Sequence, residues 1–220
     1  MRVLAYHGPS VIDGAPIRVL LTDGTRNAKT GYMIQSGILP DTVPPHVAQR
    51  TGADASVCGQ CPLRPALGGG CYVRTGDAPR STHLASLKHS DPMADRAFLQ
   101  GRLLRLGRYG DPAAVPAEVW HRLASWSAGW TGYTRQWTHP DPRVRANAGR
   151  LQNLVMASCV SESEARQAQA RGWRTFRSRP AGSPLARGEV SCPASAEAGN
   201  KIQCADCRIC SGALGRGHAS

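Results

Sequence analysis

The sequence lacks the features that would place it in a membrane or outside the cell. It has no run of about 18 or more apolar residues, the length that a membrane-spanning helix needs, so we expect no membrane partner. The N-terminal stretch MRVLAYHGPS has no apolar run followed by a small-residue cleavage site, which argues against secretion. These absences predict a cytoplasmic protein in a compartment that keeps thiols reduced.

Common catalytic signatures are missing as well. The chain contains no P-loop, Rossmann fingerprint, G-x-S-x-G or H-E-x-x-H motif. It also lacks the C-x3-C-x2-C spacing of the standard radical SAM type. What it does contain is 8 cysteines. In a reducing compartment, so many cysteines indicate metal or redox chemistry rather than disulfides.

Lysine is scarce, since 24 of the 27 basic residues are arginine. Against 15 acidic residues they give a net charge of +12, which favours a nucleic-acid or nucleotide partner. The same bias is typical of a GC-rich genome, and the arginines form no dense block. Trp130, Tyr133 and Trp137, near Arg135, can stack and pair with bases or simply form an aromatic core layer. Both interpretations stay open.

Apolar periodicity and helix caps predict an α/β fold. Between residues 98 and 180, four strand-like runs alternate with three helical ones: GRLLRLGRY, VPAEVWHRLASW, TGYTRQW, DPRVRANAGR, LQNLVMASC, SESEARQAQARG and WRTFRS. Asp141 and Ser161 are expected N-caps. Glu164 would complete a capping box, and Gly172 would end the last helix. The short connections predict a partial-barrel-like, mostly parallel sheet with crossover helices.

We expect one domain over residues 1–220, because the apolar fraction of 41% suffices for a core and two cysteine regions bracket the α/β part. RVLAYH and PIRVLLT predict N-terminal β elements, and GEVSC would add a strand that brings Cys192 to the carboxyl edge of the sheet. The segments are a β-rich N-terminal part (1–40), a first cysteine region (41–90), the α/β core (98–180), a second cysteine region (181–212) and a tail (213–220).

Polar residues follow or end several predicted strands. Parallel sheets carry their sites at the carboxyl ends of strands, so we expect a substrate site there. Asp111 can be a base or only a turn residue or helix cap. Arg177 and Arg179 can form a phosphate clamp or a solvated strand edge. The residues expected to line the site are Asp111, Arg135, Gln136 and Arg177.

The densest motif is CPASAEAGNKIQCADCRIC, which contains Cys192, Cys204, Cys207 and Cys210. Structural zinc sites usually use separated C-x2-C pairs. Ferredoxin-type clusters instead use a C-x2-C-x2-C run and a remote cysteine, often before proline. Cys192 precedes Pro193, so these four cysteines predict a 4Fe–4S cluster. The alternative is zinc, held by the last three cysteines and another ligand, with Cys192 a buried strand residue.

A second set of thiols has the spacing C-x2-C-x9-C and consists of Cys58, Cys61 and Cys71. Three protein ligands leave one coordination position open, which suits a reactive metal or cluster. A closed structural site is the alternative. Cys159 alone predicts a buried small side chain, or else a ligand or nucleophile. The candidates for the fourth position are Cys159, His83, His89 or a ligand from outside the protein.

Several of these motifs also support a resemblance to a known family. The motifs that carry the resemblance are VCGQCPLR, CYV, RLGRYGDPAAVP, TGYTRQW, MASC with GWRTFR, and CPAS with CADCRICSG. The chain resembles a family of cysteine-rich phage and prophage proteins over most of residues 25–212. The first of these motifs is also similar to one in phage proteins related to iron–sulfur, radical-type partial barrels. The resemblance implies a phage protein in a bacterial host and an iron–sulfur cluster, but no particular reaction.

These observations lead to two expectations of different classes. The first is an iron–sulfur redox or radical-type enzyme with one or two clusters, acting on a nucleotide or nucleic acid and supplied by an electron-donor protein. The second is a zinc-stabilised phage protein that binds nucleic acid without catalysis.

Overall fold

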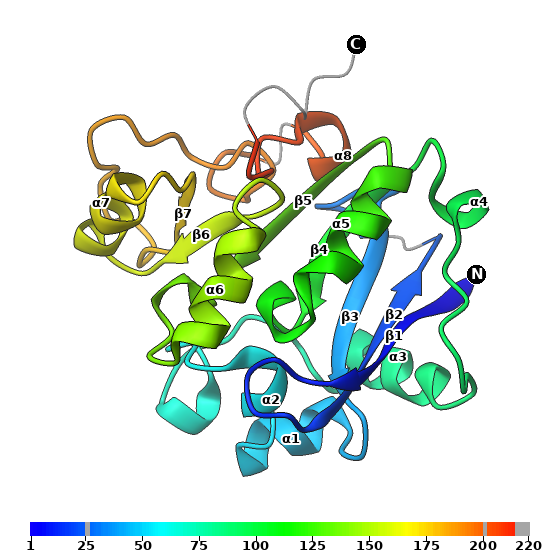
Figure 1. Ribbon diagram of the computed structural model, residues 1–220. Coiled ribbons are helices and arrows are strands. Elements are labelled where there is room, and N and C mark those ends of the chain that lie inside the picture. Colours follow the sequence, from blue (N-terminus) through cyan, green and yellow to red (C-terminus); the bar gives the residue numbers. More distant parts are fainter. Residues whose placement is uncertain (25–26, 200–201, 214–220) are drawn as a thin grey trace.

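The computed structural model describes residues 1–24, 27–199 and 202–213, and within them seven strands form one sheet (Figure 1). Their order in the sheet is their order in the chain. The first two pairs are antiparallel and the four that follow are parallel. The strands are β1 (Arg2–Pro9), β2 (Pro16–Thr22), β3 (Ile34–Pro40), β4 (Leu103–Tyr109), β5 (Gly129–Thr134), β6 (Met156–Cys159) and β7 (Thr175–Arg177).

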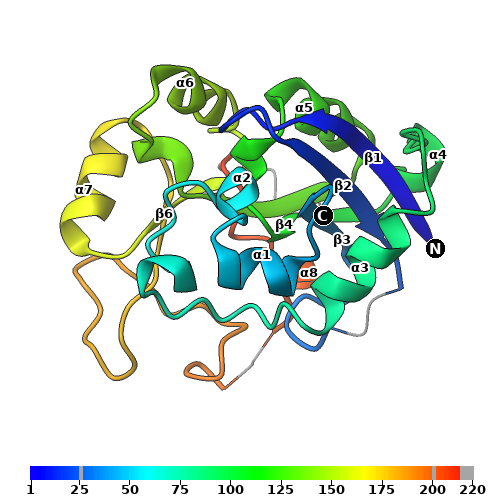
Figure 2. The same ribbon diagram turned by 90° about the horizontal axis from the view of Figure 1, so that it is seen from below.

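Three crossover helices connect the parallel strands from β4 to β7, as predicted. They are α5 (Ala117–Trp126), α6 (Pro142–Arg150) and α7 (Glu162–Ala170). Figure 2 shows α5 and α6 on one side of the sheet and α3 and α8 on the other. The remaining helices are α1 (Pro45–Thr51), α2 (Ala55–Cys58), α3 (Ala78–Ser86), α4 (Arg96–Leu99) and α8 (Cys204–Cys207), with the 3-10 turns η1 (Pro65–Leu67), η2 (Pro112–Ala114) and η3 (Gln136–Thr138).

The predicted N-caps form as expected. The Asp141 carboxylate accepts from Arg143 N at 2.8 Å, and Ser161 Oγ accepts from Glu164 N at 3.1 Å. The reciprocal half of the expected capping box is kept, since the Glu164 carboxylate interacts with the backbone N–H of Ser161, and Oε2 also accepts from Val160 N at 2.8 Å. The same carboxylate pairs with Arg135.

Alternate residues of β4 and β5 face opposite sides of the sheet. Leu104 and Leu106 join the main apolar core together with Trp120 of α5. Arg105 lies on the other side, where its guanidinium stacks on the ring of Tyr133. One face of the sheet is therefore an ordinary hydrophobic layer, while the other carries a buried charge.

Several predicted boundaries are wrong. GEVSC forms no strand. In TGYTRQW, Gln136 and Trp137 belong to η3, with Arg135 as its N-cap, rather than to β5. The strand predicted from LQNLVMASC begins only at Met156, because the five residues before it form turns. In the described part of the chain, no helix is both long and apolar enough to cross a membrane.

Candidate metal centres

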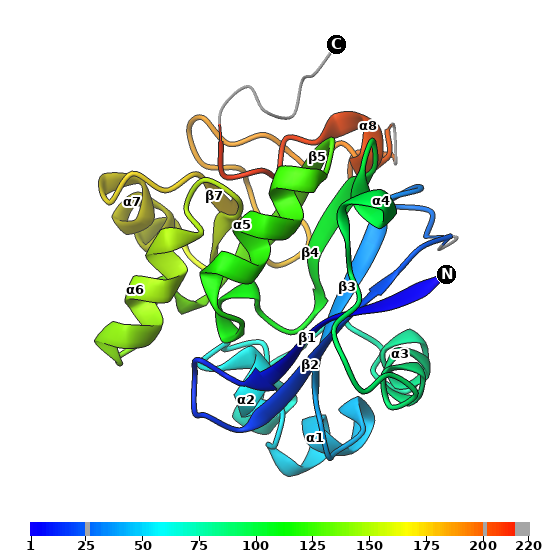
Figure 3. The same cartoon turned by 45° about the vertical axis from the view of Figure 1, so that its right-hand side comes forward.

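The first cysteine region lies in the long connection between β3 and β4, at the carboxyl end of the parallel strands (Figure 3). The turn that carries Cys58 and Cys61 is held by a buried arginine. Arg64 donates to Asp54 Oδ1 from Nη2 at 2.6 Å and from Nε at 3.1 Å. It also donates to the carbonyl oxygens of Gly52 and Gly59, at 2.8 and 2.9 Å.

Arg64 thus joins the two ends of the cysteine turn by four hydrogen bonds. Neither Arg64 nor Asp54 is predicted from the sequence. An arginine three residues after Cys61 in a Gly- and Pro-rich loop carries no periodic signal, so only the burial of the pair reveals its role.

The loops after β3, β4 and β5 meet at this turn. Gln136 Nε2 donates to the carbonyl oxygen of Cys58 at 3.0 Å and to Asp111 Oδ2 at 3.1 Å. The backbone N of Asp111 donates to Val57 O at 2.6 Å. The structure therefore brings together Asp111, Gln136 and the first cysteine region, which are far apart in the sequence.

The Asp111 carboxylate is fully engaged by its neighbours. Its two oxygens accept from Thr134 Oγ1 at 2.7 Å, Arg135 N at 2.6 Å, Ala113 N at 2.9 Å and the Gln136 amide. Burial raises the pKa of this carboxyl, although the four donors favour its ionised form. With every oxygen occupied, Asp111 ties three loops together and has no free acceptor for a substrate proton.

Two buried polar atoms in this region have no hydrogen-bond partner among the described residues: Tyr109 OH and Arg135 Nε. Tyr109 lies within electrostatic range of Cys58 and Cys71, and Arg135 within range of Cys61. Burial raises the pKa of Cys58 well above its usual value, and it also raises the pKa of Cys61. Buried polar atoms are nearly always satisfied, so these two mark a place where a further group would find hydrogen-bond partners.

Of the protein residues expected for the fourth position, Cys159 lies within electrostatic range of Arg135, as Cys61 does. Cys159 is buried in the main apolar core, and its Sγ contacts Ala157 O at 3.7 Å. His83 is buried in α3, with Nε2 at 3.2 Å from the carbonyl oxygen of Asp41. The carbonyl oxygen of His89 accepts from Arg18 on β2. Among the described residues, no hydrogen bond or ion pair joins Cys159, His83 or His89 to the three thiols, so the fourth position stays a prediction.

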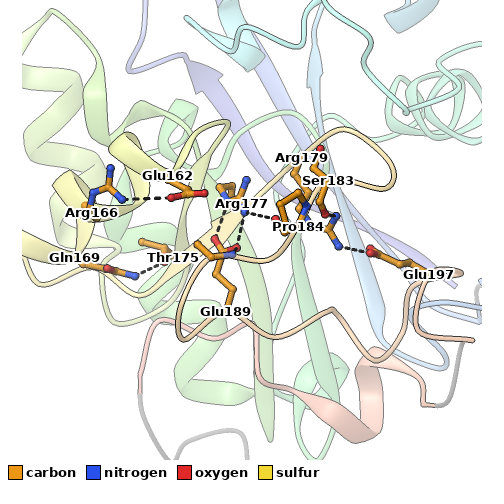
Figure 4. A network of polar contacts seen from close by, with 11 residues as sticks. Glu162, Arg166, Gln169, Thr175, Arg177, Arg179, Ser183, Pro184, Glu189 and Glu197 are labelled. Carbon is orange, nitrogen blue, oxygen red and sulfur yellow. Dashed lines mark hydrogen bonds and ion pairs between the residues drawn. The ribbon is translucent and has the colours of Figure 1, made fainter.

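Arg177 is engaged in a different network, which Figure 4 shows. Its guanidinium donates to both carboxylate oxygens of Glu189, at 2.5 and 2.7 Å. Arg179 pairs with Glu197 and with the carbonyl oxygen of Ser183. Both arginines therefore hold the segment after β7 against the sheet, and the structure does not join Arg177 to Asp111, Arg135 or Gln136.

The second cysteine region lies on the face of the sheet that carries Arg105. Cys192 and Cys204 belong to a small apolar cluster with Met33, Leu103, Ala194 and Ala205. The carbonyl oxygen of Cys210 accepts from Gly132 N at 3.0 Å, and the Cys210 thiol is hydrogen-bonded to the Tyr133 hydroxyl. Cys204 lies within electrostatic range of Cys192 and Cys207, and Cys210 within range of Cys192 and Cys204.

The expectation that both cysteine sets lie at the carboxyl edge is wrong for the second set. Cys204 N donates to Lys29 O, in the loop before β3, and the side chain of Arg208 lies beside Gly129, the first residue of β5. α8 is therefore near the amino ends of the strands, opposite α1 and α2 (Figure 1). The chain after β7 follows irregular loops, and sequence periodicity does not predict where such loops return to a sheet.

Arg105 lies beside the second set, within electrostatic range of Cys204 and Cys210. It is 8% exposed, its guanidinium carbon is 4.6 Å from the centre of the Tyr133 ring, and Nη1 donates to Thr131 Oγ1 at 3.4 Å. Tyr72, next to Cys71, and Cys210 are both within electrostatic range. Among the described residues, no carboxylate pairs with Arg105.

All eight cysteines are free thiols. In the described ranges, no three His, Cys, Asp or Glu side chains converge closely enough, as they stand, to hold a metal ion. The donor chemistry of each set nevertheless suits a thiophilic metal, because thiols become thiolates when they bind one. The second set offers four thiols beside a buried cation, and the first offers three thiols beside two unsatisfied polar atoms.

Comparison with known proteins adds no assignment to this geometry. No protein-family model, no curated protein and no solved structure matches the chain.

Proposed function

We propose that this chain is an iron–sulfur protein with two thiol-ligated centres on one α/β sheet. Cys192, Cys204, Cys207 and Cys210 hold a 4Fe–4S cluster that exchanges electrons with a donor protein. Cys58, Cys61 and Cys71 hold a second centre, where redox or radical-type chemistry takes place on a nucleotide or nucleic acid. The observation that carries this proposal is the buried Arg105.

Arg105 needs an anion in its surroundings. A guanidinium stays charged at every accessible pH, and removing it from water is costly unless a negative group lies beside it. No carboxylate supplies that charge in the described part of the chain. Thiolates bound to a metal cluster would supply it, since metal binding deprotonates all four cysteines. The C-x2-C-x2-C run favours iron and sulfide over zinc as the group bound here.

The first centre is the better candidate for chemistry. Its three cysteines leave one ligand position for a group from outside the protein. The unsatisfied Tyr109 hydroxyl and Arg135 Nε would contact such a group, while Asp111 and Gln136 hold the surrounding loops in place. A cluster bound there would supply one-electron transfer to the exogenous ligand.

Anaerobic purification tests the proposal. We expect a brown protein that absorbs at about 400 nm and contains iron and acid-labile sulfide. Cys207→Ser and Cys61→Ser should each remove the iron and acid-labile sulfide of one centre. Cys159→Ser is the matched control, because that thiol lies outside both sets, and it should leave iron and sulfide unchanged. A colourless wild-type protein with stoichiometric zinc would contradict the proposal and support the zinc-stabilised, nucleic-acid-binding alternative.

A further inference from the structure

A hollow of about 670 Å³ lies between η3, α6 and α7. No cysteine is among the residues that line it. Its size falls in the range of sites for small molecules and cofactors. The lining residues are Trp137, Thr138, Arg145, Gly149, Gln167, Arg171 and Trp173.

The positive charge at this hollow is not neutralised. In the described part of the chain, neither Arg145 nor Arg171 pairs with a carboxylate. Other arginines of the same two helices do: Arg143 pairs with Asp141 at 2.9 Å, Arg150 with Glu118 at 3.2 Å and Arg166 with Glu162 at 3.4 Å.

The two unpaired guanidinium groups are held in place by neutral partners. Arg145 Nη1 donates to the carbonyl oxygens of His139 and Pro140, at 2.6 and 2.7 Å. The guanidinium carbon of Arg171 is 5.7 Å from the centre of the Trp137 ring. These partners orient the side chains without cancelling their charge, so the hollow presents two exposed cations suited to phosphate oxygens.

The rest of the lining suits the other parts of a nucleotide. Trp137 and Trp173 are largely buried, and the Trp137 ring is fixed by a hydrogen bond from Nε1 to Ser158 O at 2.9 Å. Only the exposed edges of their indoles can contact a base or sugar, because Trp137 is 3% and Trp173 8% exposed and the guanidinium of Arg171 lies over the Trp137 ring. Gln167 adds an exposed amide, which can donate to and accept from a base edge or a sugar, and the exposed hydroxyl of Thr138, which donates to Arg135 O at 3.3 Å, can accept.

We infer that the hollow between η3, α6 and α7 binds a nucleoside phosphate, either a free nucleotide or one unit of a single strand. This inference rests on the proposed function and names its substrate class. The hollow is connected to the first cysteine set through η3. Gln136, in the same 3-10 turn as Trp137, hydrogen-bonds to the carbonyl oxygen of Cys58. A nucleotide at the hollow would thus contact the turn that supports that set.

The test compares two double variants that remove equal charge from the same helices. Binding of a fluorescein-labelled dT12 oligonucleotide and of AMP is measured by anisotropy and by calorimetry, at low salt. We expect Arg145→Gln/Arg171→Gln to weaken binding at least about tenfold and to reduce the salt dependence. Arg143→Gln/Arg166→Gln should change binding less than about twofold, because those two charges are already paired.

The two ligands distinguish the source of the nucleotide. Binding of AMP identifies a free nucleotide, and binding of dT12 alone identifies a strand. Absence of binding for both, an equal loss in both double variants, or competition by pyrophosphate as strong as by AMP would overturn the inference. Iron and sulfide are measured on the same preparations. A protein that binds nucleotide but lacks iron refutes only the proposed clusters. A protein that contains iron and sulfide but binds no nucleotide refutes only this site.

Discussion

The buried Arg64–Asp54 pair gives a strong prediction about the turn that carries Cys58 and Cys61. The two side chains are 10% and 3% exposed, and Arg64 donates four hydrogen bonds across the turn. Arg64→Met keeps most of the side-chain volume but leaves Asp54 charged, buried and unpaired. Breaking such a pair from one side costs about 3–5 kcal/mol.

A matched control is available on α7. Arg166 and Glu162 form an exposed ion pair at 3.4 Å, with side chains 70% and 48% exposed. Arg166→Met removes one charge and one ion pair, as Arg64→Met does, yet an exposed pair of this spacing contributes only about 0.2–0.5 kcal/mol. The difference between the two variants therefore isolates the effect of burial.

Urea unfolding followed by circular dichroism measures both free energies of unfolding. At this chain length, a loss of about 3–5 kcal/mol lowers the Tm by about 6–20 °C. The double variant Arg64→Met/Asp54→Asn should recover part of the loss, because it removes the stranded charge. If Arg64→Met destabilises the protein by less than about 1 kcal/mol more than Arg166→Met does, the turn is held by something other than this pair.

Three further predictions concern single positions. Gly69→Ala should destabilise the first cysteine loop by about 1–3 kcal/mol and lower its metal content, because a Cβ there would meet backbone at 2.2 Å. Gly70→Ala is the control: a Cβ there has nothing within 4 Å, so unfolding and metal analysis should show little change. Burial raises the pKa of Cys159 to about 11, so about one Cys159 thiol in a thousand is ionised at a pH of about 8. Iodoacetamide should therefore label Cys159 only after denaturation. A mass spectrum that shows Cys159 labelled in the native protein would contradict this prediction. The hydrogen bonds from Arg177 lower the pKa of Glu189 to about 2. The stability that this pair contributes is therefore present above pH about 4.3, the pKa of the unfolded state, and is lost as the pH falls toward about 2. Arg177→Gln should raise the pKa of Glu189 in an NMR titration, and an unchanged pKa would count against the pairing.

Much of the α/β core could be predicted from sequence because its signals are local. The alternation of GRLLRLGRY and the caps at Asp141 and Ser161 depend only on neighbours a few residues away, and the structure has β4, α6 and α7 at those places. The parallel arrangement follows from the order of these elements, since short crossovers constrain how successive strands can pair. β3 gives a weaker signal in the sequence, because this buried strand has no polar alternation to show its period.

The roles of individual polar residues could not be predicted in the same way. Asp111 and Arg177 lie at strand ends, where substrate-binding residues are expected. In the fold, however, Asp111 accepts four hydrogen bonds, and Arg177 is paired with Glu189. Arg105 has no motif at all, and its importance comes from being buried without a carboxylate.

The sequence by itself determined the alternation of strands and helices in the α/β core and the spacing of the thiols, because periodicity, caps and short motifs act over a few residues. Only the tertiary structure decided which groups became neighbours: the Cys58 turn with Gln136, and Cys210 with Tyr133 and Arg105. Such contacts join residues dozens of positions apart, and they depend on how loops without regular structure fold back onto the sheet and which charges are removed from water there.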